Sequence, residues 1–327
     1  MNATFCVFRL PVLALKEVLK CLKPIELFEL SQCSRKASQI VRIVGKLSIE
    51  LDFYRCYIVI NEKQFIFAYG KPKEKDVVGI RKFQNNTVNV AFDSKDEMFT
   101  YWENRITGIE QVFCYFIGVF NCTVAGTYIG HFVYSSTKVP WEVLHFCLQI
   151  TPKHELKEFE LAADELTNEN VTWILENVKV TERLWISQKL SDDFNYNGKP
   201  FEAKCVTLFH SSWIKLDHLS QLLYKCVMLQ LLESLWNNEE VVEFIRLWRA
   251  GRFPNLQNFI LKSENLDENL KIDGLDALED TVAQAKFSRK IGDQIMMIHS
   301  GVPIKRDDGS IGQIRYFKNK GEIHLFI

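Results

Sequence analysis

Hydrophobic and polar positions follow the clearest pattern near the N-terminus, between Phe8 and Val44. On a helical wheel one half of the stretch ending at Leu22 is apolar, and it carries Val12, Ala14, Leu15, Val18, Leu19, Cys21 and Leu22. Lysines and one glutamate occupy most of the other half, where Leu13 is the exception. A helix that packs on one core needs an apolar stripe of only about 100°. The pattern therefore predicts a helix to about Cys21 with a wider apolar face than one contact requires.

Two more short helices are predicted directly after it. Pro24 suits the first position of a second helix, since the N–H that proline lacks has no partner there. Ser34 can cap a third, basic helix. Three short helices in about 40 residues bury too little surface to be stable alone, so they need the rest of the chain or a partner.

From Lys46 to about residue 105 the pattern becomes β-rich. Leu47–Leu51 alternates apolar and polar residues, and Tyr57–Ile60 and Phe65–Tyr69 are rich in β-branched and aromatic types. Asn61 to Lys63 is a predicted hairpin between the last two runs. A further strand is predicted at Val88–Phe92.

Helical periodicity dominates from Ile109 to Phe120, with further helices predicted at 139–148, after Thr167, at 217–224 and at 237–248. Between them a strand-like pattern recurs, which reads Leu-x-x-Phe-x-Leu at Leu156 and at Leu256. The steps from Phe159 to Leu184, Val206, Leu229 and Phe259 are 25, 22, 23 and 30 residues. Leucine-rich repeats have similar periods, so we predict stacked strand–helix units; the alternative is a non-repetitive α/β domain.

The C-terminal part returns to strands, with hairpins predicted at Asp308-Gly309 and at 319–321. The expected fold class is therefore α+β with an α/β part. Its predicted domains are three helices at 1–45, a β-rich connecting segment at 46–105, and a leucine-rich-repeat-like domain at 106–327. Because the later segments have apolar faces of their own, we expect the chain from Lys46 onward to fold without the three helices.

Composition narrows the possible functions. The chain has 327 residues, of which 47% are apolar, and its formal net charge is −1. It thus lacks the overall positive charge that would hold nucleic acid or an anionic membrane. Its 9 cysteines are scattered without a Cys-x-x-Cys pair, and no secretion signal is recognised, which predicts reduced thiols in the cytoplasm or nucleus.

No motif predicts catalytic residues, a metal site or a cofactor. The seven histidines do not fall in a metal-ligand spacing. No Gly-x-Ser-x-Gly elbow or catalytic cysteine signature is present. Most of six tryptophans lie in apolar stripes, so core packing is expected rather than a stacking surface for nucleic acid (Trp141, Trp173, Trp185, Trp213, Trp236 and Trp248). Residues 305–308 are expected to form a solvated turn rather than a recognition patch.

The N-terminal helices resemble the F-box, and in particular the F-box of nematode families that also carry an F-box-associated domain. The resemblance rests on the residues that would contact the partner: Leu10, Pro11, Val18, Leu19, Leu22, Pro24, Leu27, Leu30, Ser34 and Arg35. The chain departs from the common motif where Ser34-Arg35-Lys36 replaces a segment similar to Cys-Arg-Trp. The alternative is a helical cap on the following domain.

Residues 150–265 are similar to the F-box-associated domain, through Phe159 to Leu161, Leu184 to Ile186, Asn237 to Trp248 and Phe253 to Leu256. The resemblance implies a substrate-recognition subunit of a Skp–cullin–F-box ubiquitin ligase with no catalytic residues of its own. Its F-box would dock on the Skp-type adaptor, and through it on cullin, while the C-terminal domain would bind an unknown client protein. The alternative is an interaction scaffold without a role in ubiquitination. No obligate homo-oligomer is inferred.

Overall fold

The structure is a computed structural model that describes residues 7–69, 77–93, 97–130, 141–163, 166–191, 193–267, 269–273, 286–291, 294–299 and 301–327. Contacts divide the chain into two compact units, one of Met1–Ile129 with Pro140–Ile150 and one of Gly130–Val139 with Thr151–Ile327. These boundaries differ from the three predicted domains, because the helices of the first 45 residues share a unit with the β-rich segment. The predicted domains stay a prediction about what folds independently.

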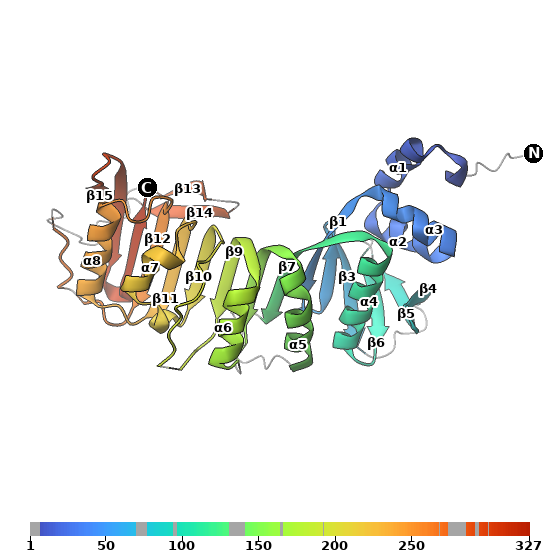
Figure 1. Ribbon diagram of the computed structural model, residues 1–327, viewed down its shortest axis with the longest axis horizontal. Coiled ribbons are helices and arrows are strands. Elements are labelled where there is room, and N and C mark those ends of the chain that lie inside the picture. The colour runs from blue at the N-terminus through green and yellow to red at the C-terminus, as the bar shows by residue number, and fades with distance from the viewer. Residues whose placement is uncertain are drawn as a thin grey trace, which may run out of the picture. The chain divides into compact units, whose positions relative to one another are not determined.

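The first unit begins with the three predicted helices (Figure 1). They are preceded by the short turn η1 (Val7–Arg9) and followed by η2 (Val41–Val44); their bounds are α1 (Val12–Lys20), α2 (Pro24–Cys33) and α3 (Arg35–Ile40). Pro24 is the first residue of α2, and the Ser34 side chain accepts a hydrogen bond from the Ala37 N–H at the start of α3. Both predicted helix starts are confirmed.

A mixed sheet with two helices completes this unit. The elements are β1 (Lys46–Asp52), β2 (Tyr57–Ile60), β3 (Lys63–Tyr69), β4 (Gly79–Phe83), β5 (Asn86–Phe92), β6 (Met98–Trp102), α4 (Arg105–Val119), β7 (Asn121–Gly130) and α5 (Trp141–Ile150). The strand order is β7-β1-β2-β3-β6-β5-β4. Asn61 and Glu62 connect β2 to β3 with positive φ angles of 43° and 71°, which is the geometry of a tight hairpin turn. The predicted hairpin is thus confirmed.

Helix α4 belongs to this unit, although its sequence was assigned to the C-terminal domain. Its apolar positions Ile109, Val112, Phe113 and Phe116 are all buried, as the periodicity predicts. Phe113 and Phe53 each pack edge-on against Phe146 of α5. The predicted start of α5 at Val139 lies outside the described residues.

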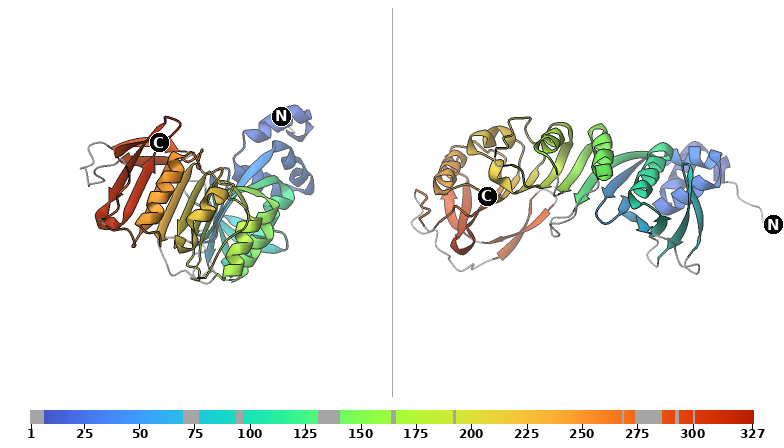
Figure 2. Two further views of the ribbon diagram at one scale, coloured as in Figure 1. Left: turned by 60° about the vertical axis from the view of Figure 1, so that its left-hand side comes forward. Right: turned by 90° about the horizontal axis from the view of Figure 1, so that it is seen from below.

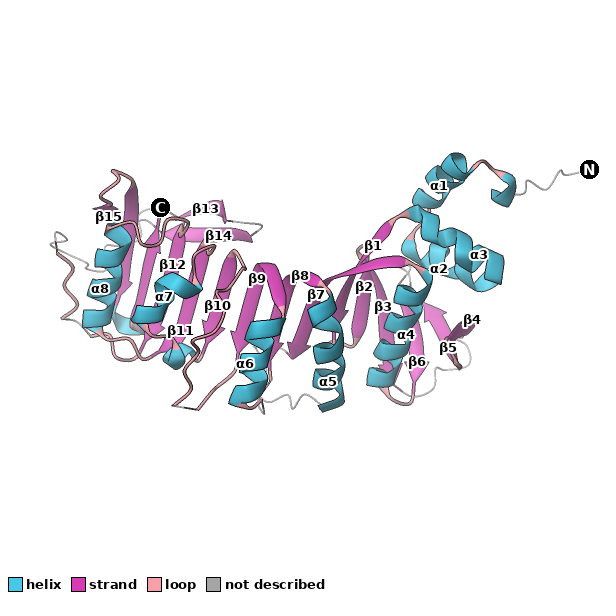
Figure 3. Ribbon diagram, in the orientation of Figure 1, coloured by secondary structure: helices cyan, strands magenta, loops and turns pink. Residues whose placement is uncertain are grey.

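The second unit is a larger sheet with helices on one face (Figures 1 and 3). Its elements are η4 (Thr151–Lys153), β8 (Glu155–Ala162), α6 (Asn168–Asn177), β9 (Lys179–Ser187), β10 (Cys205–Phe209), η5 (Ser211–Trp213), α7 (Leu216–Leu222), β11 (Met228–Ser234), α8 (Asn238–Arg249), β12 (Asn258–Ser263), β15 (Val302–Lys305), β16 (Ile311–Phe317), η6 (Lys318–Lys320) and β17 (Glu322–Phe326), with a separate hairpin of β13 (Lys286–Ile291) and β14 (Gln294–His299). Strands β8 to β12 are parallel neighbours in chain order, and β17, β16 and β15 continue the sheet antiparallel. Helices α6, α7 and α8 lie side by side on the same side of these strands, as the view from below also shows (Figure 2).

The recurring strand pattern aligns across the parallel strands. Phe159 pairs with Leu184, Leu184 with Val206, Val206 with Leu229, and Leu229 with Phe259. Each of the five is at most 6% exposed, so they form one continuous row inside the core. The sequence positions counted for a repeat therefore occupy equivalent places in the sheet.

The connection from β9 to β10 departs from strand–helix alternation. Its described residues contain no helix, and aromatic side chains pack there instead: Phe194 and Tyr196 both lie edge-on to Trp213, with ring centroids 5.3 and 6.3 Å away. The structure shows N-terminal helices followed by mixed sheets with helices, an α+β fold overall. The likeness to leucine-rich repeats stays a prediction.

Two expectations about buried and exposed side chains hold only in part. Lys305, Asp307 and Asp308 are exposed as a solvated turn requires, but Arg306 is only 7% exposed and stacks over the Trp248 ring at 5.4 Å. Trp213, Trp236 and Trp248 are buried, whereas Trp173 is 36% exposed and Trp185 is half-buried. The buried face of α6 consists of Val171, Ile174 and Leu175, and Trp173 lies outside this face.

Candidate partner interface

Helix α1 presents apolar side chains on two sides. Leu15 and Leu19 point into the first unit and are 5% and 1% exposed. Val12, Leu13 and Val18 remain 67%, 79% and 41% exposed. Exposed apolar side chains on a short helix are typical of a surface that a protein partner covers. The broad apolar face expected from the sequence therefore divides into an inner part with Leu15 and Leu19 and an outer part with Val12 and Val18, while Leu13 is exposed on the half that is otherwise polar.

The structure distributes the ten predicted contact residues over three environments. Leu19 and Leu27 are buried, Leu10, Leu22, Pro24 and Leu30 are half-buried, and Pro11, Val18, Ser34 and Arg35 are exposed. Leu19 and Leu27 do not reach the surface, because they face the chain's own core. Val12 and Leu13 are missing from the predicted contact residues, although both are exposed. The width of the apolar face pointed to Val12, and the one apolar residue on the polar half of the helix is Leu13.

Helix α2 is fixed to the β-rich segment through its aromatic residue. Phe28 is fully buried, and its ring packs against Phe65 of β3, Phe83 of β4 and Phe116 of α4 with centroid distances of 5.9, 5.2 and 5.8 Å. Removing the first 45 residues would leave this aromatic cluster open to water. The packing argues against the expectation that the chain folds normally from Lys46.

Polar contacts hold the same helix in one orientation. Both carboxylate oxygens of Glu29 accept hydrogen bonds from Arg81 Nε at 2.8 Å, and a third contact runs from Arg81 Nη2 at 2.7 Å. The Gln32 side chain donates to the Lys82 carbonyl at 2.9 Å and accepts from its N–H at 3.3 Å. Ser31 and Tyr115 share a hydrogen bond of 2.7 Å between their hydroxyls. Strand β4 and helix α4 thus hold α2 in place, which is one of the helices that the F-box resemblance predicts to contact the adaptor.

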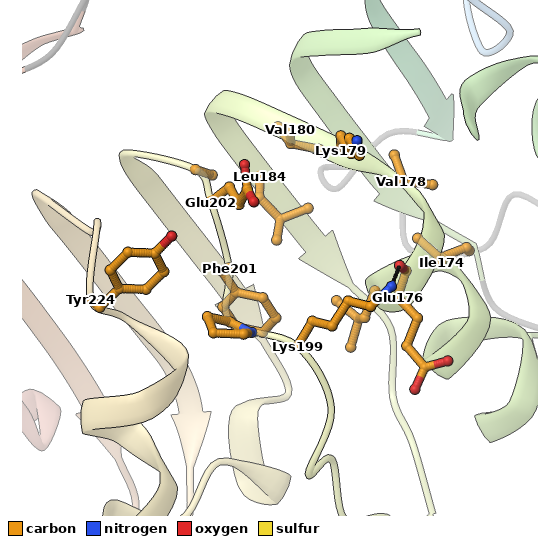
Figure 4. Close-up of a pocket in the computed structure, with 13 residues that line it drawn as sticks. Ile174, Glu176, Val178, Lys179, Val180, Leu184, Lys199, Phe201, Glu202 and Tyr224 are labelled. Carbon is orange, nitrogen blue, oxygen red and sulfur yellow. Dashed lines mark hydrogen bonds between the residues drawn. The ribbon is translucent and has the colours of Figure 1, made fainter. Parts of the chain in front are cut away.

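The second unit contains a small cavity of about 210 Å³ between the end of α6, the start of β9 and the segment before β10 (Figure 4). Its walls are mostly apolar and include Ile174, Val178, Leu184 and Phe201. Tyr224, which follows α7, borders the cavity and is 45% exposed. This arrangement can hold an apolar side chain.

Within the described residues, no three His, Cys, Asp or Glu side chains gather as a metal site requires. Burial raises the pKa of the Cys122 thiol to about 12 and the pKa of Cys147 above its ordinary range, which disfavours the thiolate in both. Among the helices in the described ranges, none is both long and apolar enough to cross a membrane.

Comparison with known families covers both the N-terminal helices and part of the second unit. Residues 7–48 match the family described as F-box domain, and residues 198–261 match the family described as F-box associated. The chain is an F-box protein with an F-box-associated region.

Two Caenorhabditis elegans proteins are similar to this F-box protein along most of its length. An uncharacterized protein is 21% identical over 98% of this chain and 78% of its own length. The Skn-1 dependent zygotic transcript 15 protein is 23% identical over 83% of each chain. No solved structure matches.

The two families together indicate the general role. F-box domains in general bind the Skp-type adaptor and so link to cullin. An F-box followed by an F-box-associated region is typical of a non-catalytic adaptor that recognises substrates for a Skp–cullin–F-box ligase.

Proposed function

We propose that this F-box protein is a substrate-recognition subunit of a Skp–cullin–F-box ubiquitin ligase. Helices α1 to α3 dock on the Skp-type adaptor, and the second unit binds the protein to be ubiquitinated. The observation that carries the proposal is the outer side of α1, where Val12 and Leu13 are exposed although the same helix is anchored by Leu15 and Leu19.

The adaptor surface consists of the exposed and half-buried members of the predicted set, together with two additions. These residues are Leu10, Pro11, Val12, Leu13, Val18, Leu22, Pro24, Leu30, Ser34 and Arg35. Leu19 and Leu27 act indirectly, since they hold α1 and α2 against the core. Apolar side chains at the centre of an interface carry most of its affinity, so we assign the largest contributions to α1.

The second unit supplies the client side. The in-register row from Phe159 to Phe259 supports a leucine-rich-repeat-like arrangement of strands β8 to β12. The unit needs no catalytic residue, because holding a client lysine near a charged conjugating enzyme raises their effective concentration. We place the protein in the cytoplasm or nucleus, which suits the eight described cysteines, all of them thiols rather than disulfides.

Co-purification with a Skp-type adaptor tests the docking. The full chain should retain the adaptor, whereas the double substitution Leu10→Ala with Pro11→Ala should release it with little change in the melting temperature. Adaptor retention at the wild-type level would contradict the proposal. A cullin-dependent change in client half-life then separates a ubiquitin ligase subunit from a scaffold.

A further inference from the structure

We propose that the cavity beside Tyr224 is the client-anchoring site: it takes one apolar side chain of a client segment, next to which the segment carries a carboxylate. The proposal rests on the proposed function, since it names the kind of client segment that the second unit recognises. It is argued from the size of the cavity, the chemistry of its walls and the charges at its edge.

The volume excludes larger occupants. Sites for cofactors and drug-sized molecules measure roughly 300–1,000 Å³, whereas this cavity measures about 210 Å³. One side chain of the size of leucine or phenylalanine suits such a space. Single apolar anchors that fill pockets of this kind dominate many protein interfaces.

The walls select an apolar group. Ile174 and Leu184 are buried on the helix side of the sheet and Phe201 is 4% exposed, so the inner wall belongs to the rigid core. The partly exposed ring of Tyr224 forms the outer wall (Figure 4). An anchor entering the cavity would therefore cover a tyrosine that is otherwise in contact with water.

The charges at the edge favour a carboxylate beside the anchor. Two glutamates and two lysines line the cavity. Glu202 forms an ion pair with Lys225 at 3.7 Å, and the Glu176 carboxylate points away from the cavity (Figure 4). Lys199 donates to the Glu176 carbonyl at 3.1 Å, a neutral backbone group at the end of α6, and Lys179 is exposed. Of the four charged side chains, the two lysines are therefore the ones placed to meet an incoming carboxylate.

Short capped peptides test the site on the full chain, with methyl NMR signals of Ile174, Val178 and Leu184 as the readout. The peptides are acetyl-Gly-Leu-Asp-Gly-amide, the same peptide with Ala for Leu, and the same peptide with Lys for Asp. The Leu-Asp peptide should shift these signals saturably, with a dissociation constant on the order of 1 mM. The Ala peptide should bind at least ~10-fold more weakly, because it lacks most of the anchor.

Two exposed positions give variants that should keep the fold. Tyr224→Ala should weaken the Leu-Asp peptide about tenfold through loss of the outer wall. Lys179→Glu should weaken it about fivefold at low salt and reverse the preference for Asp over Lys. Lys189→Glu, an exposed lysine that does not line the cavity, is the matched control and should bind as the wild type does.

Two results would overturn the assignment: no methyl shifts with any peptide up to its solubility limit, or equal binding by the wild type and by Tyr224→Ala. Adaptor co-purification by the same variants keeps the two proposals separate. If the wild type retains the adaptor but binds none of the peptides, only the assignment of the cavity as the client site is refuted. If the wild type does not retain the adaptor, the proposed docking of the F-box is refuted.

Discussion

Helices α1 and α8 are both amphipathic, yet their apolar faces end in different environments. In α8 the whole stripe of Val241, Phe244, Ile245 and Trp248 is at most 1% exposed. In α1 only the inner residues are buried, while Val12 and Leu13 remain in water. Helix α8 thus has partners within the chain for its whole apolar stripe, whereas α1 has partners for only part of its apolar side chains.

The ends of the two helices differ in the same way. Asn237 and Glu240 form a reciprocal capping box at the start of α8, and Gly251, with a φ of 80°, closes its end through hydrogen bonds from Gly251 to Trp248 and from Arg252 to Leu247. Helix α1 begins at Val12, and Pro11 at its N-cap position provides no side-chain cap. Residues of the chain itself thus cap both ends of α8, whereas α1 has an N-terminus without a side-chain cap and exposed apolar side chains.

The largest effect is expected where α8 is fully enclosed. Trp248→Ala should lower the free energy of unfolding of the second unit by roughly 3–5 kcal/mol, since it opens a cavity and removes the ring under Arg306. Urea denaturation followed by circular dichroism measures the loss. Glu239→Ala on the exposed side of α8 is the control and should be nearly neutral. A loss below about 1 kcal/mol would mean that α8 is not held as the packing indicates.

Substitutions on the outer side of α1 should weaken adaptor binding and leave the stability of the fold almost unchanged. Val12→Asp with Leu13→Asp should reduce adaptor binding at least ~100-fold, because two charges would have to lose water in the interface. The melting temperature should hardly change, since both side chains are already exposed. Surface-bound adaptor titrated with the purified chain gives the affinity, and Gln39→Asp on the exposed side of α3 is the control. A large drop in stability instead would identify α1 as a structural cap.

A smaller loss of stability is expected when the side-chain cap at the start of α8 is removed. Asn237→Ala should destabilise the second unit by about 1 kcal/mol, because the Glu240 N–H loses its acceptor at 3.0 Å. Replacement by Ser, which also caps well, should restore most of the loss. Thermal denaturation of the three proteins provides the measurement, and equal stability of all three would show that the cap contributes nothing.

The smallest effect concerns the polar side of α1. Lys20 donates a 2.8 Å hydrogen bond to Glu17, which holds the pKa of that carboxyl below its ordinary value. A lowered pKa stabilises the fold at neutral pH and loses its effect as the pH falls through that pKa. Lys20→Ala should raise the pKa of Glu17 in an NMR titration while adaptor binding stays unchanged. Weaker adaptor binding would place the partner on the polar side of the helix.

Local pattern was sufficient for most of the secondary structure. The helix starts at Pro24, Thr167 and Asn237 depend only on the residue itself and on residues within one turn of it, so they can be predicted directly from the sequence. The repeated strand pattern likewise predicted which residues would align from Phe159 to Phe259, because a similar spacing of apolar residues within each strand places equivalent positions side by side in the sheet. The F-box resemblance came from the same local spacing of apolar residues.

Which core each apolar face would join was decided only by the tertiary structure. The periodicity of α2 shows that Phe28 needs a partner, but the three phenylalanines around it lie 37, 55 and 88 residues further along the chain. Leu19 and Leu13 are equally apolar in the sequence, and packing alone buries the first and exposes the second. Arg306 shows the converse, since the fold brings the Trp248 ring against this charged residue and leaves it only 7% exposed. Local spacing determined the helices and strands; contacts between distant residues decided which of their faces remained for a partner, because burial depends on what the folded chain places opposite each side chain.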